Sequence, residues 1–251
     1  MKTIRSLFNR EDTAGIMFTL PFTLGFLFFM IVPMGISLYY SFCKYNILSP
    51  PVFTGLDNFK NMIADGTFLQ TIKVTFFFAF VSVPLKLIFA LLVAMLLLKN
   101  TKMSGIYRAA YYLPSIIGGS VAVAILWKRM FAMVDVVNKL LGSIGIKTCI
   151  SWLCDTKTAI WILILLAVWQ FGSSMLIFLS SLKQIPTSLY EAAMVDGANP
   201  VSRFFKITLP LLTPTIFFNL VMQMINGFLA FTQCYIITQG KIGRASCRER
   251  V

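Results

Sequence analysis

The amino-acid sequence predicts an all-α membrane protein. Of its 251 residues 58% are hydrophobic, and the mean hydropathy is +0.81. Charged residues make up only 12% and lie mostly between long apolar runs. Runs of about 20 apolar residues are long enough to cross a bilayer as helices. These observations together favour a helical bundle embedded in lipid.

Five apolar segments are predicted to span the membrane, at residues 14–38, 71–98, 107–127, 158–181 and 211–238. The first follows a short basic leader, residues 1–13, and contains Pro21 and Pro33 as possible kinks. It is too long for the apolar region of a signal peptide, and no small-residue cleavage site follows it. We therefore expect a membrane span with the leader, and so the N-terminus, in the cytoplasm.

The net charge of +13 reflects Lys and Arg that flank the apolar runs. Such flanking charges set membrane topology and give no indication of nucleic-acid binding. The sequence has no His, which excludes His-based catalytic triads and His metal ligands. It also has no Gly-x-x-x-x-Gly-Lys phosphate loop, so we expect no ATP hydrolysis by this chain itself. No cofactor and no metal are predicted.

The connecting segments leave two questions open. Residues 39–70 form a polar outer loop that is expected to hold a turn and a short interfacial helix, and residues 128–157 form a second outer loop. The second loop is rich in Lys and Arg, so counting charges fixes the orientation only weakly. Cys149 and Cys154 lie in it, and they either pair in an oxidising space or have no role. Lys86, deep in the second span, either faces protein or a water-filled path, or reaches outward past Pro84.

Amide side chains mark a possible path through the membrane. In the fifth span, polar residues recur near helical spacing and form one stripe: Thr215, Asn219, Gln223, Asn226 and Gln233. Gln170 lies in the fourth span. Buried amides are costly unless they are paired or wet. They either line a path for hydroxyl-rich solutes or join helices through hydrogen bonds. The candidate path residues are Asn219, Gln223, Asn226 and Gln170.

Residues 185–210 are the one long polar segment between two strongly apolar runs. Ser188 and Glu191 have the spacing of a capping box, which predicts a helix from Leu189. Gly197 can take the positive φ that ends it. Asn199 followed by Pro200 predicts the start of a second helix. The segment is therefore expected to be a helix, a glycine turn and a helix at the membrane face.

This segment resembles the EAA loop of permeases from binding-protein-dependent ABC importers. The match consists of Glu191-Ala192-Ala193, Asp196-Gly197-Ala198 and Leu209-Pro210 at the spacing of that family. The resemblance implies a MetI-like, type I importer permease with one transmembrane domain over residues 14–240. Flanking strings, including Arg108 to Pro114 followed by Trp127, resemble carbohydrate importers of the maltose and glycerol-3-phosphate type. The family has a sixth span, whereas residues 241–251 are abruptly basic and are predicted to be a non-native tail.

The resemblance implies a transport subunit of the bacterial cytoplasmic membrane that works by alternating access. Its implied partners are a second related permease, a dimer of cytoplasmic ATP-binding subunits and an extracytoplasmic solute-binding protein. Within the loop, Glu191 is then the charged contact to the ATPase, Gly197 forms the turn and Asp196 braces it. Ala192, Ala193 and Ala198 permit close docking.

Two alternatives stay open at this stage. One is an ABC permease for a polyamine, phosphate or amino acid, because the EAA loop does not select the solute. The other is an ion-coupled secondary transporter. All nine acidic residues lie outside the apolar spans, which counts against ion coupling.

Overall fold

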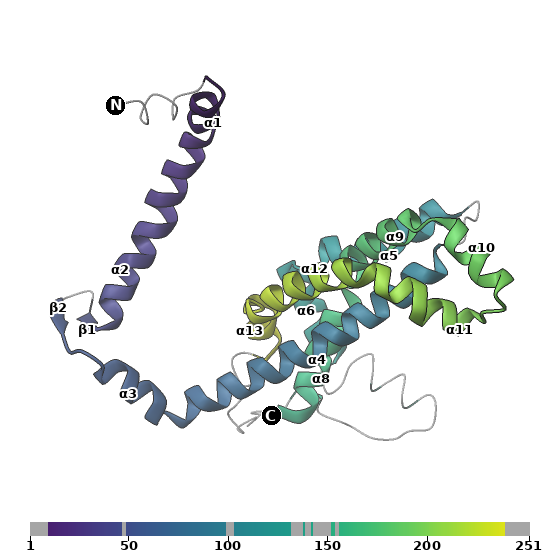
Figure 1. Ribbon diagram of the computed structural model, residues 1–251. Helices are drawn as coiled ribbons and strands as arrows, with labels where there is room; N and C mark the ends of the chain where they lie inside the picture. The colour runs from purple at the N-terminus through teal and green to yellow at the C-terminus, as the bar shows by residue number, and fades with distance from the viewer. Residues whose placement is uncertain are drawn as a thin grey trace. The chain divides into compact units, whose positions relative to one another are not determined.

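A computed structural model describes residues 10–46, 49–98, 103–131, 138, 142, 152–153 and 156–238 (Figure 1). Cys149, Cys154 and the predicted tail at 241–251 lie outside these residues. The chain separates into two compact units, Met1–Leu69 and Gln70–Val251. Each unit is described by itself.

The first unit begins with one long apolar helical span. It consists of α1 (Arg10–Phe26), a π-helical turn η1 (Leu27–Ile31) and α2 (Val32–Ser41). Residues Gly15–Ser41 are long and apolar enough to cross a membrane, and none of their most apolar window is buried by protein. Pro21 lies inside α1 and Pro33 at the start of α2. The exposed apolar surface of this helix therefore needs lipid or another protein around it.

A short hairpin and a helix follow the first span. Strand β1 (Cys43–Asn46) pairs antiparallel with β2 (Ser49–Phe53), and α3 covers Asp57–Ala64. The predicted turn and short helix are confirmed, but the hairpin is an addition to the all-helical prediction. Two consecutive prolines, Pro50 and Pro51, argue against a strand in a sequence. They are tolerated here because the sheet has only two strands, so β2 is an edge strand.

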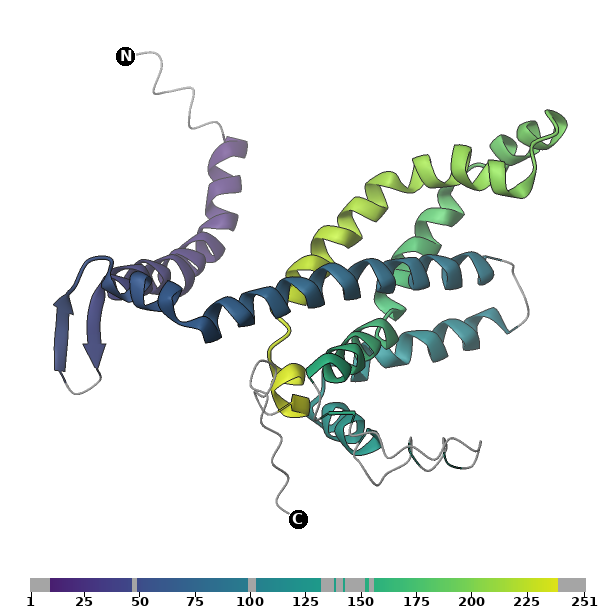
Figure 2. The same cartoon turned by 90° about the horizontal axis from the view of Figure 1, so that it is seen from below.

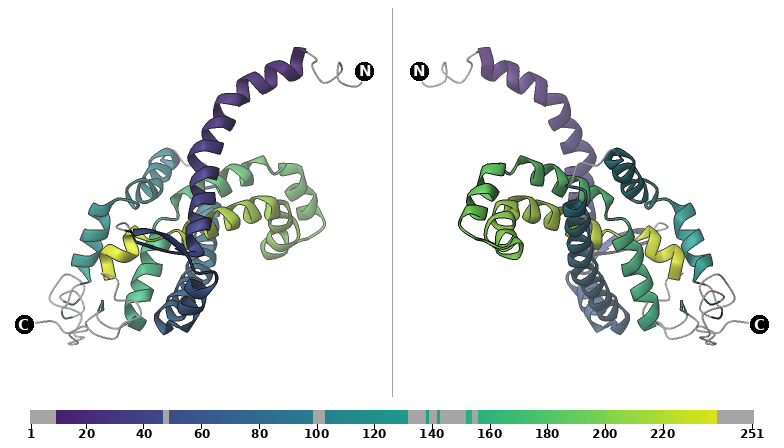
Figure 3. Two further views of the ribbon diagram at one scale, coloured as in Figure 1. Left: turned by 90° about the vertical axis from the view of Figure 1, so that its left-hand side faces the viewer. Right: turned by 90° about the vertical axis from the view of Figure 1, so that its right-hand side faces the viewer.

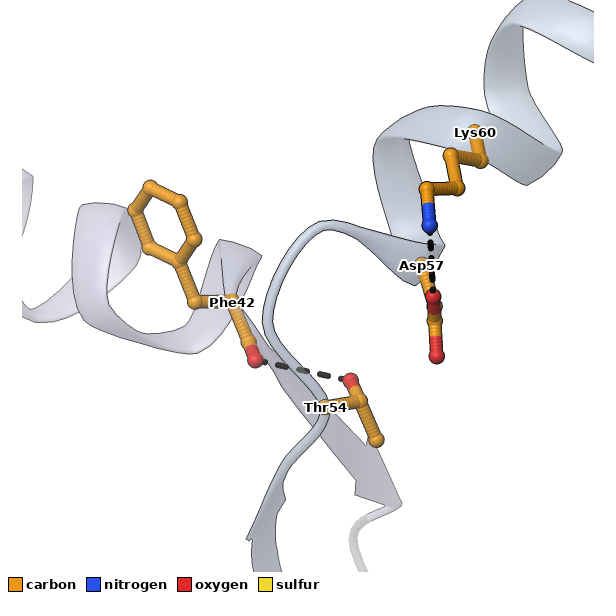
Figure 4. A network of polar contacts seen from close by, with 4 residues as sticks. All are labelled: Phe42, Thr54, Asp57 and Lys60. Atoms are coloured by element: carbon orange, nitrogen blue, oxygen red, sulfur yellow. Dashed lines mark hydrogen bonds and ion pairs between the residues drawn. The ribbon is translucent and has the colours of Figure 1, made fainter.

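Polar contacts close this loop on itself (Figure 4). The backbone N–H and the hydroxyl of Thr54 both donate to the carbonyl oxygen of Phe42, at 2.9 and 3.4 Å. Lys60 Nζ lies 3.6 Å from Asp57 Oδ1 on the exposed face of α3. Asn58 Nδ2 donates to the carbonyl oxygens of Ser41 and Cys43 at 3.0 and 2.9 Å. These bonds fix the start of α3 against the end of α2.

The second unit is a helical bundle that includes most of α4. Its helices are α4 (Gly66–Leu96), α5 (Ser104–Ile117), α6 (Val121–Met130), α8 (Thr156–Trp169), α9 (Gly172–Gln184), α10 (Thr187–Val195), α11 (Pro200–Arg203), η2 (Phe204–Thr208), α12 (Leu209–Phe228) and α13 (Thr232–Thr238). Two stretches, Gly66–Leu96 and Pro200–Phe228, are long and apolar enough to span a membrane. The bent pairs α5–α6 and α8–α9 pass the same test when each is taken as one span. Five spans in the whole described chain are thus consistent with the sequence.

The third, fourth and fifth expected spans are interrupted (Figure 2). The third was expected to run unbroken over 107–127, but α5 and α6 meet at 96°. Gly118 and Gly119 sit at this bend, and the Ser120 side chain starts α6 by accepting a hydrogen bond from the N–H of Val123. The fourth was expected over 158–181, but α8 ends at Trp169 and α9 begins at Gly172, at an angle of 42°. The fifth was expected over 211–238, but α12 ends at Phe228 and α13 is a separate short helix.

Two apolar clusters hold the bundle together. One joins the second half of α4 to α9 and α12, and the other joins the first half of α4 to α6, α8 and α13. Small residues bring helix backbones close together. A Cβ atom at Gly172 of α9 would lie only 2.7 Å from Tyr112 Cα of α5, and one at Gly227 of α12 would lie 3.5 Å from Ala79 Cβ of α4. Contacts of this kind are how helices associate in lipid.

Candidate functional site

The polar segment between α9 and α12 forms a compact projecting loop at the opposite end of the second unit from α13 (Figure 1 and Figure 3). Helix α10 begins at Thr187, with Pro186 as the residue before it and no side-chain cap. The predicted capping box of Ser188 and Glu191 is therefore wrong. Pro186 holds the extended conformation of a helix-preceding residue, so Ser188 already lies in the first helical turn, where it cannot cap.

Gly197 ends α10 as predicted. Its φ is +72°, in the left-handed region that favours glycine. The N–H of Ala198 donates to the carbonyl of Ala193 at 2.9 Å, and the N–H of Gly197 donates to that of Met194 at 3.1 Å. This pair of bonds is a Schellman motif, which satisfies carbonyl groups at the helix end. The turn is thus fixed by the backbone itself.

The second predicted helix start is also confirmed. Asn199 accepts a hydrogen bond from the N–H of Ser202 at 2.7 Å, and Pro200 is the first residue of α11. The loop is tied to the bundle by a 2.9 Å contact between the hydroxyl groups of Tyr190 in α10 and the buried Thr208 in η2. Asp196, the residue predicted to brace the turn, is exposed, and that role stays a prediction.

The outer surface of the loop combines a carboxylate with apolar side chains. Glu191, Ala192, Asp196 and Gly197 are exposed, whereas Ala193 and Ala198 are half-buried. Val195 is 89% exposed and Met194 is 52% exposed. These two residues were missed in the sequence, although two apolar residues directly before an Asp-Gly turn are an available signal. A valine this exposed on a fixed turn suits contact with another protein.

An open polar cavity of ≈ 340 Å³ lies among the helices of the second unit. It is lined by residues at all three helix interruptions: Gly119 between α5 and α6, Gln170 between α8 and α9, and residues 229–231 between α12 and α13. Non-helical backbone at membrane depth is tolerated where it lines such a cavity. Three of the four predicted path residues are brought together here: Gln170, Gln223 and Asn226.

Hydrogen bonds connect the lining residues across helices. Lys86 Nζ of α4 donates to Gln223 Oε1 of α12 at 2.9 Å. Gln170 Nε2 donates to Gln233 Oε1 at 3.4 Å, and Gln233 Nε2 donates to the carbonyl of Gly118. The amides thus both line the cavity and join helices. Lys86 faces this cavity, which answers the question that the sequence left open.

Asn219, the fourth predicted path residue, lies elsewhere. Its side chain is only 1% exposed, and Nδ2 donates to the carbonyl of Thr215, one turn earlier in the same helix, at 3.2 Å. Thr215 in turn meets Ser181 of α9 through a 2.9 Å hydroxyl contact. The predicted stripe therefore divides into a part that joins α9 and α12 and a part that lines the cavity.

Apolar spans, a polar cavity at their interruptions and a fixed loop at one end define a multi-pass membrane transport protein. Residues 61–246 match the family described as "Binding-protein-dependent transport system inner membrane component". This range includes both the loop and the cavity. The chain belongs to that family, and it is a permease subunit of a transport system that depends on a binding protein.

Similar proteins agree with this family. The chain is 54% identical to the probable ABC transporter permease protein YesP of Bacillus subtilis, over 97% of this chain and 79% of that protein. It is 32% identical to the probable starch degradation products transport system permease protein AmyD of Thermoanaerobacterium thermosulfurigenes, over 92% and 78%. A crystal structure of a bacterial ABC transporter that imports the acidic polysaccharide alginate matches with a TM-score of 0.79 and 25% identity. The match covers 97% of this chain and 84% of that one.

Proposed function

We propose that this chain moves a sugar through the cytoplasmic membrane as one permease subunit of an ATP-driven importer. A second, related permease pairs with it, two ATP-binding subunits dock at the cytoplasmic face, and an extracytoplasmic protein delivers the sugar. The observation that carries the proposal is the combination, in one unit, of a polar cavity with an exposed, backbone-fixed loop at its end. Relatives named for sugar transport, such as AmyD, support the choice of solute.

The loop transmits motion because it is rigid and connected. The Schellman turn and the Asn199 cap fix its shape, and the contacts Tyr190–Thr208 and Ser181–Thr215 join it and α9 to α12. A force applied to α10 is therefore passed to α12, which lines the cavity. We assign Glu191, Val195 and Met194 to the contact with the ATPase. Gly197 supplies the turn, and Ala192, Ala193, Asp196 and Ala198 shape the docking face.

The cavity is the proposed sugar path. Gln170, Gln223 and Asn226 present carboxamides, which both donate and accept hydrogen bonds and so match sugar hydroxyl groups. Ser115 and Ser173 add hydroxyl groups to the lining. When the loop moves with the ATPase, the interrupted helices change their mutual arrangement and open the path to one side or the other.

The experiment is sugar-dependent ATP hydrolysis by the complete importer in proteoliposomes. Val195→Asp changes a side chain that is 89% exposed, so we expect folding to be unaffected and ATP hydrolysis to be lost. Val52→Asp is the matched control, because Val52 is an exposed valine in the hairpin of the other unit. Full sugar-dependent hydrolysis in Val195→Asp would contradict the assignment of the loop.

A second variant tests the path. Asn226→Leu removes an exposed carboxamide from the cavity lining, and we expect weaker transport at unchanged assembly with the partner subunits. The control is Phe217→Leu, at an exposed position of α12 outside the cavity. An equal loss of transport in both variants would show that the substitutions act through the stability of α12, and it would contradict the proposed path.

A further inference from the structure

The polar cavity holds one charged group. Among the described residues that line it, Lys86 is the one that carries a charge. Within the described part of the chain, the hydrogen bond to Gln223 is the one that its ammonium group makes. An ammonium group has three donors, so two are left for another partner. A cation at membrane depth is costly unless it is paired or hydrated, and it commonly marks a pathway.

The chain supplies no carboxylate to this lysine from the surrounding helices. The sequence has no Asp or Glu over residues 66–134, 156–190 or 197–248, which include every element that lines the cavity. The ion pair that the described residues form, Asp57–Lys60, belongs to the other unit. The positive charge of Lys86 is therefore not neutralised by these helices.

Helix ends of both kinds meet at the cavity. Gly119 lines the cavity directly before the cap of α6, and Ser173 lines it in the first turn of α9. The first amides of a helix and its dipole favour a negative group nearby. In membrane transporters, the starts of interrupted helices are often directed at anionic groups of the solute. The C-terminal end of α12 also lines the cavity, at its cap Leu229, so opposite dipole ends offset one another and Lys86 is the group that favours an anion.

We propose that the solute is an acidic saccharide whose carboxylate binds Lys86 while its hydroxyl groups bind the neighbouring carboxamides. This inference rests on the proposed function and narrows its substrate class. A single lysine with no arginine in the lining fits one monoanionic group better than a phosphate, which usually takes several donors. The cavity volume of ≈ 340 Å³ lies at the small end of ligand sites, about 300–1,000 Å³, so it suits a short saccharide segment.

The test measures sugar binding to the complete importer in nanodiscs without the binding protein, by saturation-transfer NMR titration. The probes are digalacturonate and its neutral counterpart galactobiose, with glucose 6-phosphate and glucose as a phosphate pair. We expect digalacturonate to bind roughly 10- to 150-fold more tightly than galactobiose, the range of one charge-assisted hydrogen bond. The preference should fall when NaCl is raised, because salt screens the charge.

Three variants assign the preference to Lys86. In Lys86→Met the acid preference should disappear, and an unchanged Tm of the complex shows that it is folded. In Lys86→Arg the preference should remain. Lys73→Met is the matched control, because Lys73 is an exposed lysine of the same helix outside the cavity.

Each contrary result has its own meaning. Equal binding of galactobiose and digalacturonate to the wild type, or an acid preference that survives in Lys86→Met, would overturn the acidic-saccharide inference and leave the sugar path standing. Tighter binding of glucose 6-phosphate than of digalacturonate would overturn the proposal that Lys86 binds a carboxylate. Binding of neither member of either pair would contradict the sugar path itself.

Discussion

Replacing Gly197 by Ala tests the loop turn without a steric complication. The φ of Gly197 is +72°, and a Cβ atom built on it meets no described atom within 4 Å. The cost is therefore conformational alone. An L-residue in this left-handed region costs about 1–2 kcal/mol, which is a factor of roughly 5–30 in the equilibrium between the closed and the open turn.

Amide hydrogen exchange reads this equilibrium directly. The N–H groups of Gly197 and Ala198 are held by the turn, at 3.1 and 2.9 Å from their acceptors, so they exchange when it opens. We expect exchange in the segment 193–199 to speed up by about 5- to 30-fold in Gly197→Ala. Gly197→Asn should lie between that variant and the wild type, because Asn tolerates the left-handed region.

Gly105→Ala is the control for the same chemical change. Gly105 lies in the first turn of α5, and a Cβ atom there also meets no described atom within 4 Å. Alanine is at least as favourable as glycine in a helix, so exchange in α5 should stay equal or slow down. Unchanged exchange at 193–199 in Gly197→Ala, or equal acceleration in α5 of Gly105→Ala, would refute the reasoning.

Three further predictions concern packing, bracing and topology. Gly172→Ala places a Cβ atom 2.7 Å from Tyr112 Cα, so we expect about 1–3 kcal/mol of destabilisation and a lower Tm of the complex. An unchanged Tm would contradict the close approach of α5 and α9. Tyr190→Phe removes the hydroxyl that meets Thr208, and exchange in α10 should rise by about 2- to 13-fold, an effect that must vanish when Thr208→Val is already present. With the five native cysteines replaced, Val52→Cys and Val195→Cys should react with a membrane-impermeant maleimide from opposite sides of the membrane. If each bent pair crosses once, three spans lie between the hairpin and the loop, namely α4, α5–α6 and α8–α9, and an odd number of crossings ends on the other side. Labelling of both from the same side would contradict the five-span topology.

Local chemistry made much of the loop predictable. Gly197 and the Asn199–Pro200 pair act through their own backbone and immediate neighbours, so the sequence alone indicated the turn and the second helix start. The Ser188–Glu191 box failed for a local reason as well. A proline two residues earlier already began the helix, and that competing signal outweighed the box.

Contacts between residues far apart in the sequence could not be predicted from local patterns. The brace Tyr190–Thr208 joins residues 18 apart, and the pair Lys86–Gln223 joins residues 137 apart. Helical spacing placed Asn219, Gln223 and Asn226 near one face, but it carried no information on which neighbour covers each. Burial of Asn219 and the cavity position of Asn226 depend on how the other helices pack on α12. The interruption after Phe228 lies inside an apolar run with no proline, so the sequence did not predict it.

Cysteine crosslinking from Val195 tests the central claim most directly. This position is 89% exposed, which makes it a better probe than the half-buried Ala193. In membranes that contain the full-length chain without native cysteines, the sister permease and the ATP-binding subunits, Val195→Cys should crosslink to an ATP-binding subunit, with a yield that changes when ATP is added. Val52→Cys should not. An accessible, folded Val195→Cys protein that gives no crosslink would contradict the account of the loop as the coupling element.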